Sequence, residues 1–514
     1  MAQMMNAVDV GTRRQLVFDD ALIQSRDGFV ATMNPATRHD QPLLLPERPW
    51  EEVAIWRWVS VVESGGTFHM WYDAFGWDPT GVFRWIPRLC YATSRDGVKW
   101  ERPNLGVVEF QGNRDNNIVF EGLGNRNPLW PGKPNFAAVG AVFKDPVAPP
   151  SQRFKYIFTD NHYTTKEASQ DGGLIYGACS PDGIRWNVMK REPIIPWYGD
   201  TMNVCFWDDR IRKYVAYVRW DEGKDFRNGK WGYFDRNFKE ELIRVSAWED
   251  NPPQYSSAQH IRHIARAESD DFAEFPKPEK ILCADEQDDP NMGLYHTAAV
   301  KYPFADNAYF MFPGAFYGEW AMPATIDVQM ATSRDGIRFR RWREPFVRLG
   351  LEGTFDCRMI DMGVGMLRRG NELLMYYGGR NVDHGQLPNT KPGDGGIGMA
   401  RIRLDGFVSL DAAASGGTLT TVPLRSNGNQ LVVNMDGSAG GTIKVEILDE
   451  LNKPIEGLSG KEADTLHGND VNRPVTWGGS KDLSAFQGRA ISLRISGKSV
   501  KFYAFQFIDS KEQS

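Results

Sequence analysis

The chain has 514 residues and a formal net charge of −6, so it is long enough for more than one domain and a large hydrophobic core. The negative charge argues against nucleic acid or an anionic membrane surface as the main partner, and no apolar run is long enough to cross a bilayer. The first residues show no basic segment before an apolar core, so we predict no signal peptide and a soluble protein, cytoplasmic unless a leader has been removed. The oligomeric state is left open.

Residues 1–50 contain one short strand pattern and then a proline-rich approach, and we predict an extension that packs on the next domain. Residues 51–408 then repeat one order of elements five times. In each unit an apolar strand is followed by an aromatic strand and by a hairpin. Strand alternation without any long helical pattern predicts an all-β chain.

The hairpins of these units share an Asp-Gly turn. Strong copies lie at residues 91–100, 175–186 and 327–339, and a weaker copy lies at 260–275. Asp and Gly tolerate the positive φ that tight turns between strands need. Five such units predict a five-bladed β-propeller over residues 51–408. A β-sandwich with chance hairpins is the alternative.

Composition changes after residue 408, where tryptophan becomes rare and Gly, Ser, Thr and Val increase. Short strand patterns with polar turns predict a C-terminal β-sandwich over residues 409–514. The fold class is therefore all-β, a five-bladed β-propeller followed by a β-sandwich.

Five units, three of which carry Ser-x-Asp-Gly-x-x-Trp or -Phe hairpins, followed by a sandwich, resemble the five-bladed β-propeller glycoside hydrolases. These include the invertase-like and arabinanase-like families 32, 43 and 68 and the mannoside phosphorylases of family 130, and the chain looks like a divergent member. The resemblance implies a glycosidase that cleaves terminal glycosidic bonds, including furanosidic ones, of an oligo- or polysaccharide. The Asn-Asp-Pro-Asn, Arg-Asp-Pro and Glu-Cys-Pro motifs of invertases are absent, so no catalytic residue is carried over.

Carboxyl groups at the mouth of a propeller channel are the natural catalysts for this chemistry. Inner strands converge on one pocket, and glycoside hydrolysis needs one protonated and one ionised carboxyl group. Acids just before or at the start of first strands are the candidates, namely Glu51, Asp200 and Asp356. The alternative is a loop acid or, for Asp200, an Asx turn that caps a strand.

Further residues near strand ends are predicted to bind substrate. Aromatic side chains can stack on sugar rings, and Arg219 could hold a carboxylate or an acidic sugar. The predicted set is Trp50, Asp73, Asp160, Arg219, Asp289, Tyr295, His296, Glu319, Glu352 and His384. Glu352 is also the substitute for Asp356 as a catalytic acid.

Two other functions fit the same pattern. A non-catalytic carbohydrate-binding propeller would keep the aromatic residues without paired acids. A glycoside phosphorylase would need a cationic cluster, which Arg219, His296, Arg358 and His384 could form. No cofactor is predicted to be required, although oxygens at residues 112–117 are compatible with a structural Ca²⁺. Carbohydrate is the predicted partner.

Overall fold

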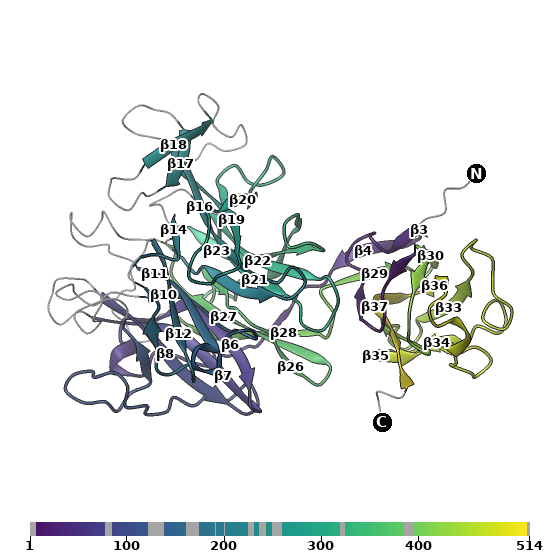
Figure 1. Cartoon of the computed structure of the whole chain (residues 1–514), viewed down its shortest axis with the longest axis horizontal. Helices are drawn as coiled ribbons and strands as arrows, with labels where there is room; N and C mark the ends of the chain where they lie inside the picture. The colour runs from purple at the N-terminus through teal and green to yellow at the C-terminus, as the bar shows by residue number, and fades with distance from the viewer. Residues whose placement is uncertain are drawn as a thin grey trace.

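The computed structural model describes residues 7–77, 85–121, 138–160, 174–190, 192–199, 201–224, 231–235, 243–248, 260–318, 324–384 and 395–510. Regular elements within these ranges are β-strands and short 3-10 helices, so the predicted all-β class is confirmed. Figure 1 shows a larger lobe and a smaller lobe, with both chain ends at the smaller one. Over the same ranges, no helix is long and apolar enough to span a bilayer.

The larger lobe begins with three separate antiparallel sheets. The first has the order β6 (Ala54–Ser64), β7 (Thr67–Trp77), β8 (Trp85–Ser94), β9 (Ile118–Phe120). The second contains β10 (Ala138–Lys144), β11 (Phe154–Asp160), β12 (Leu174–Ser180), β13 (Asn187–Val188) and β14 (Ile195–Tyr198). The third contains β15 (Val204–Asp208), β16 (Lys213–Lys224), β17 (Trp231–Asp235), β18 (Ile243–Trp248), β19 (His260–Ser269) and β20 (Glu279–Leu282).

A nine-stranded sheet completes the larger lobe. One part contains β21 (Met292–Lys301), β22 (Tyr309–Tyr317), β23 (Thr325–Ser333) and β24 (Arg340–Val347). The other contains β25 (Met359–Met362), β26 (Leu367–Arg369), β27 (Glu372–Arg380), β28 (Gly396–Arg403) and β5 (Thr37–Arg38). One parallel pairing, Ile326 with Met359, joins the two parts. Short 3-10 helices are η1 (Pro49–Glu51) and η2 (Pro150–Gln152) here, and η4 (Ser484–Phe486) in the smaller lobe.

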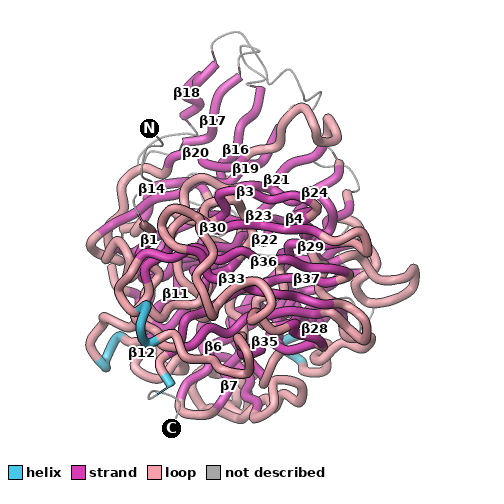
Figure 2. Tube along the Cα trace, turned by 90° about the vertical axis from the view of Figure 1, so that its right-hand side faces the viewer, coloured by secondary structure: helices cyan, strands magenta, loops and turns pink. Residues whose placement is uncertain are grey.

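The smaller lobe is built from two sheets. The seven-stranded sheet contains β1 (Val8–Asp9), β3 (Ile23–Asp27), β30 (Gly417–Thr421), β31 (Leu424–Arg425), β33 (Thr442–Leu448), β34 (Thr465–His467) and β36 (Ala490–Lys498). The six-stranded sheet contains β2 (Gln15–Leu16), β4 (Phe29–Met33), β29 (Val408–Ala412), β32 (Gln430–Asp436), β35 (Asn469–Pro474) and β37 (Val500–Ile508). Figure 2 looks from the side of this lobe and shows β30, β36 and β33 next to one another. Residues of both sheets, such as Ile495 and Phe505, share one hydrophobic core.

The N-terminal strands differ from the prediction for residues 1–50. β1, β2, β3 and β4 pair with β31, β37, β30 and β29, so they complete the sheets of the smaller lobe. Only the later part of the segment reaches the larger lobe, where β5 pairs with β28. Strand pairing across several hundred residues leaves no local trace in the sequence, so the sequence did not indicate the pairing of β1 to β4 with the smaller lobe.

The three strong Asp-Gly turns have the same internal hydrogen bonds. In the first, Ser94 Oγ donates to Asp96 and accepts from the N–H of Gly97. The Asp96 carboxylate in turn accepts from two later backbone N–H groups. Gly97, Gly183 and Gly336 have φ values of 74°, 75° and 73°, a region that favours glycine. The recurring sequence motif is thus a recurring local structure.

Each of these turns is also held by an aromatic donor from another sheet. Trp71 Nε1 donates to the Gly183 carbonyl, Tyr217 Oη to that of Gly336 and Tyr376 Oη to that of Gly97, each at 2.7 Å. Tyr376 lies in β27 and Gly97 lies in the turn after β8. The Tyr376 hydrogen bond therefore connects one of the last strands of the larger lobe to its first sheet.

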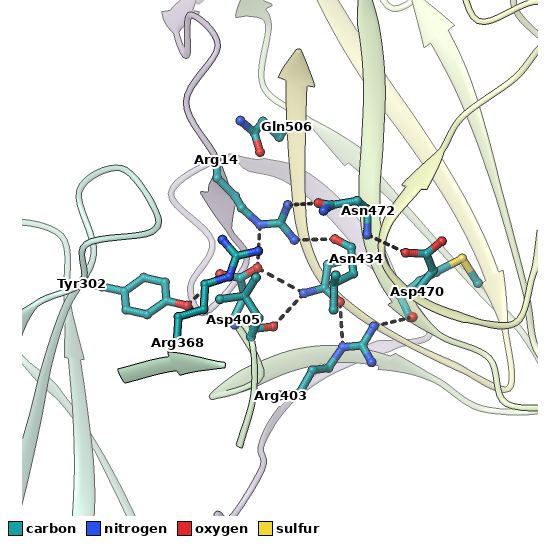
Figure 3. A network of polar contacts seen from close by, with 12 residues as sticks. Arg14, Tyr302, Arg368, Arg403, Asp405, Asn434, Asp470, Asn472 and Gln506 are labelled. Atoms are coloured by element: carbon teal, nitrogen blue, oxygen red, sulfur yellow. Dashed lines mark hydrogen bonds and ion pairs between the residues drawn. The ribbon is translucent and has the colours of Figure 1, made fainter. Parts of the chain in front are cut away.

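A buried polar network joins the two lobes (Figure 3). Arg14 donates from Nε to Asp405 at 2.5 Å and from Nη1 to Asn472 at 2.7 Å. The Tyr302 hydroxyl donates to the other Asp405 oxygen at 2.9 Å, and Asn434 Nδ2 donates to the first at 3.1 Å. Tyr302 belongs to the larger lobe and Asn472 to the smaller. Asp405 therefore accepts hydrogen bonds from both lobes.

Candidate active site

A bulge interrupts β6, the first strand of the first sheet. Ile55 pairs with Ala74 and Val59 pairs with Tyr72, so residues 56–58 all lie opposite the single residue Asp73. Bulges of this kind re-aim side chains and are frequent beside active sites. Here the extra residues include Trp56 and Trp58.

A second bulge lies in β21. Leu294 pairs with Ala315 and Thr297 with Pro313, so Tyr295 and His296 lie opposite Gly314 alone. A Cβ at Gly314 would lie 2.9 Å from His296 Cε1, so the glycine leaves room for the imidazole. Both bulged strands are first strands of their units, the position that faces the centre of a propeller.

Tyr295 is the centre of a cationic and aromatic cluster. The guanidinium carbons of Arg219 and Arg262 lie 5.4 and 5.2 Å from its ring centroid, within cation–π range. The Phe316 ring stacks on it at 5.6 Å. His384 Nε2 lies 3.2 Å from the Tyr295 hydroxyl. These residues come from β16, β19, β21, β22 and the segment after β27.

Two buried carboxyl groups adjoin this cluster. Asp221, two residues after Arg219 on the same face of β16, forms an ion pair with it at 2.7 Å. Asp361 in β25 lies 3.2 Å from Nδ1 of His296. All four side chains are nearly inaccessible to solvent, so their orientations are fixed by packing as well as by pairing.

The tryptophans of the β6 bulge form an aromatic wall. Trp56 packs against Phe75 at a ring-centroid distance of 4.5 Å and against Trp58 at 6.3 Å. The Arg380 guanidinium lies 4.5 Å from the Trp56 ring. Trp56 is only half-buried. An indole with a partly open surface is the kind of platform on which sugars stack.

Asp73 lies opposite this wall and is 1% exposed. Among the residues that the structure describes, neither of its carboxyl oxygens has a hydrogen-bond partner. Burial raises the pKa of Asp73 well above its ordinary value, and the nearby N–H of Gly140 opposes this only in part. Sequence reasoning predicted Asp73 as a substrate-binding residue, and its surroundings set it apart from the other acids.

Glu51 occupies a closed polar network at the end of η1. Its carboxylate accepts from Tyr72 Oη at 2.7 Å, from the N–H of Glu47 at 3.0 Å and from Arg102 at 3.2 Å. Burial raises the pKa of Glu51, while Arg102 and the hydrogen bonds favour its ionised form. Both oxygens therefore already have protein partners.

Asp356 is also fully buried and fully bonded. Arg38 and Tyr377 donate to Oδ2 at 2.5 and 2.8 Å, and Thr354 donates to Oδ1 at 2.9 Å. Arg38 lies in β5 and Tyr377 lies in β27, so the hydrogen bonds of Asp356 link the N-terminal segment to β27. The partners of Asp356 and of Glu51 are different, and Asp200 lies outside the described residues, so their predicted common cavity remains a prediction.

The remaining predicted residues fall into three groups. Trp50 is buried, meets Phe110 edge-on and donates from Nε1 to Asn117 at 2.9 Å, so it packs in the interior instead of forming an open sugar platform. Asp289 is exposed and caps its own loop, with the Asn291 N–H donating to it. Glu352 is 80% exposed and pairs with Arg358. The side chain of Asp160 and residue Glu319 lie outside the described part.

The cationic cluster that a phosphorylase would need is partly assembled. Arg219 and His384 both contact Tyr295, and His296 is the next residue of the chain. Arg358 instead pairs with Asp383 at 2.7 Å and with Glu352 at 3.2 Å. Arg262, which the sequence analysis did not name, lies beside Tyr295.

Sequence reasoning missed Asp221, Arg262, Asp361 and the two bulge tryptophans. Asp221 could have been found, because the two-residue strand period puts it on the same face as Arg219. The bulges could not, because they depend on how each strand registers with its partner. For the predicted Ca²⁺, no cluster of three or more His, Cys, Asp or Glu that could hold a metal occurs within the described ranges.

Asp327 in β23 provides a pH-dependent prediction. Burial raises its pKa from 3.8 to about 6, with Arg348 opposing. The folded state holds this proton more tightly than the unfolded state. Ionised Asp327 therefore destabilises the folded state: this loss of stability is absent below pH 3.8 and fully present above pH 6. Asp327→Asn is expected to raise the free energy of unfolding at pH 7 by about 2–3 kcal/mol, and to change it little at pH 3.5. Urea titrations at both pH values measure this, and an equal effect at both would contradict it.

Comparison with known proteins gives no close relative. No family model matches the sequence. Two Mycobacterium tuberculosis proteins, "Uncharacterized protein MT1551" and "Uncharacterized protein Rv1502", are 25% identical over 169 residues, covering 30% of this chain and 44% of theirs. The chain thus spans less than half the length of the curated relatives it matches.

Several solved structures are similar at low identity. One, from work on the GH130 family of mannoside phosphorylases and the hydrolases within it, is 14% identical over 72% of this chain and 94% of its own, with a TM-score of 0.43. A β-1,2-mannobiose phosphorylase from Listeria innocua is 11% identical over 72% and 97%, also at 0.43. A family 43 arabinoxylan arabinofuranohydrolase from Bacillus subtilis is 13% identical over 92% and 99%, at 0.40. These structural neighbours are from glycoside hydrolase and phosphorylase families that the sequence resembles.

Proposed function

We propose that the larger lobe is a glycosidase that binds a carbohydrate between the bulges of β6 and β21 and hydrolyses a terminal glycosidic bond. The observation that carries this is the pair of bulges on first strands. The bulge in β6 lies opposite the buried Asp73, and the bulge in β21 carries His296 next to the buried Asp361. Trp56 supplies a stacking surface, and Asp73, Asp221 and Asp361 supply acids. The protein's partner is then a carbohydrate, and no cofactor is required.

The architecture behind this proposal is a five-bladed propeller with a β-sandwich. Four-stranded or larger groups β6–β9, β10–β14, β15–β20, β21–β24 and β25–β28 would be the blades. The Tyr376 contact to Gly97 supports closure of the last blade onto the first. The two sheets of the smaller lobe with their shared core support a sandwich, which includes the N-terminal strands.

The carboxyl groups would divide the two tasks of hydrolysis. One must be neutral and give a proton to the departing oxygen, and the other must be ionised and activate water or attack the sugar. Asp73, Asp221 and Asp361 are the buried carboxyl groups among which these two tasks would be divided. Glu51 and Asp356, two of the acids predicted from sequence, would then stabilise the fold around the site through their hydrogen bonds. Asp200 remains a candidate catalytic acid.

A phosphorylase is the second candidate, because Arg219, Arg262 and His384 surround Tyr295. Guanidinium groups are well suited to phosphate. Phosphate in place of water would accept the glycosyl group and give a sugar phosphate.

The test is an assay on aryl glycosides and on plant and algal oligosaccharides, run with and without inorganic phosphate. Release of reducing sugar without phosphate is the expected result. Strict dependence on phosphate would establish the phosphorylase. Binding of a sugar with no turnover under either condition would overturn both enzymes in favour of a carbohydrate-binding protein.

A further inference from the structure

Asp73 is a carboxyl group that the fold buries without a hydrogen-bond partner among the described residues. Its side chain is 1% exposed, and within the described ranges no donor or acceptor lies in hydrogen-bond geometry to either oxygen. Burying a polar group without a hydrogen-bond partner is unfavourable, because the group loses its hydrogen bonds to water. Such groups are rare in native structures, and a catalytic role is one of the explanations for them.

We propose that Asp73 is the proton donor of the site and protonates the leaving-group oxygen of a sugar bound at residues 56–58. This inference rests on the glycosidase function proposed above and adds an assignment that the function alone does not make. The position follows from register, because Asp73 is the single residue opposite the bulge that carries Trp56 and Trp58.

The surroundings of Asp73 keep its proton in place. Burial raises its pKa well above the ordinary value. The neighbouring titratable groups are Cys90 on β8 and Tyr156 on β11, and a charge on Asp73 raises the pKa of each. The N–H of Gly140 on β10 lowers the Asp73 pKa without reaching hydrogen-bond geometry. A neutral carboxyl group at neutral pH is what a general acid must be.

The aromatic wall explains how a substrate would reach this acid. Asp73 and Phe75 lie two positions apart on β7 and therefore on the same face. Phe75 packs on Trp56, which carries the Arg380 guanidinium on its ring. A sugar in contact with Trp56 would thus lie next to Phe75, on the face of β7 that also carries Asp73.

The step can be balanced with water as the co-reactant. Asp73 transfers its proton to the glycosidic oxygen, the bond from the anomeric carbon to that oxygen breaks, and the electron pair stays on the departing alcohol. Water oxygen bonds to the anomeric carbon, either directly or after a glycosyl-enzyme intermediate. One water proton is released, which restores the neutral Asp73.

The experiment compares Asp73→Asn with the parent on two aryl glycosides of the same sugar, one with a good leaving group such as 2,4-dinitrophenol and one with a poor one such as phenol. Asparagine keeps the volume and the neutral charge but cannot give a proton. We expect kcat/KM to fall about a hundredfold or more on the phenyl substrate and only a few-fold on the dinitrophenyl substrate. The basic limb of the pH profile should disappear in the variant.

Asp327→Asn is the matched control, because it removes another buried acid with a raised pKa and should reduce activity on neither substrate. Infrared spectra supply a second readout, in which Asp73→Asn should remove a protonated-carboxyl band at pH 7. Equal losses on both substrates, no loss, or an unchanged carboxyl band would overturn the role of Asp73 while leaving the glycosidase intact. A parent protein that cleaves no glycoside would overturn the proposed function and, with it, this role.

Discussion

Replacing Asp221 or Asp361 with asparagine is expected to lower kcat about a hundredfold or more on any glycoside that the parent cleaves. Asp221 is fixed by Arg219 at 2.7 Å, and Asp361 lies 3.2 Å from the His296 ring. Such restraint places a carboxyl group accurately for attack on a sugar or on water. Steady-state kinetics with each variant measure the loss.

Glu51→Gln and Asp356→Asn are the informative comparisons. The sequence predicted that these two acids are catalytic. In the structure their carboxylate oxygens accept hydrogen bonds from Tyr72, Arg102, Arg38 and Tyr377. We expect these variants to lose stability, because their hydrogen-bond donors lose an ionised partner, and to lose less catalytic rate per folded molecule than the Asp221 and Asp361 variants. Full activity in Asp221→Asn and Asp361→Asn, with inactive but folded Glu51→Gln or Asp356→Asn, would restore the assignment made from sequence.

Arg14→Leu is expected to lower the free energy of unfolding by about 3–5 kcal/mol, because it leaves the buried Asp405 carboxylate without its positively charged partner. Arg14 is 7% exposed and its partner Asp405 is 0% exposed. Asp405 would keep hydrogen bonds from Tyr302 and Asn434 but lose its cation. Urea unfolding followed by tryptophan fluorescence measures the change.

The adjacent Arg13 provides the control. It pairs with Asp306 at 3.0 Å, but its side chain is 55% exposed, and exposed pairs contribute about 0–1 kcal/mol. Arg13→Leu should therefore have almost no effect. Equal losses from the two variants would mean that the network between the lobes does not stabilise the protein in the way that Figure 3 suggests.

The turns were predictable from sequence because their cause is local. Ser94, Asp96 and Gly97 bond to one another within four residues, so a short motif contains all the information. The pairing of β3 with β30 was not predictable, because the paired residues Asp27 and Thr418 are far apart in the sequence. Nothing near residue 27 records that partner.

The candidate site was predictable only in part for the same reason. Arg219, Tyr295, His296 and His384 were predicted because they were expected near strand ends. The structure brings them together, although only His384 lies near the end of a strand. Glu51 as a catalytic acid remains a prediction, because an acid beside a tryptophan fits a capping network as well as a sugar site. The proposed site depends on the two bulges. They could not be predicted, because a bulge is defined by how a strand pairs with its neighbour.

A crystal structure of the protein with a bound monosaccharide product of the assay tests the proposed site most directly. The sugar should lie against Trp56, between the bulges of β6 and β21, with a ring or hydroxyl oxygen within hydrogen-bond distance of Asp73, Asp221 or Asp361. A sugar found only on the smaller lobe, or in the larger lobe without contact to any of these residues, would contradict the assignment of the site.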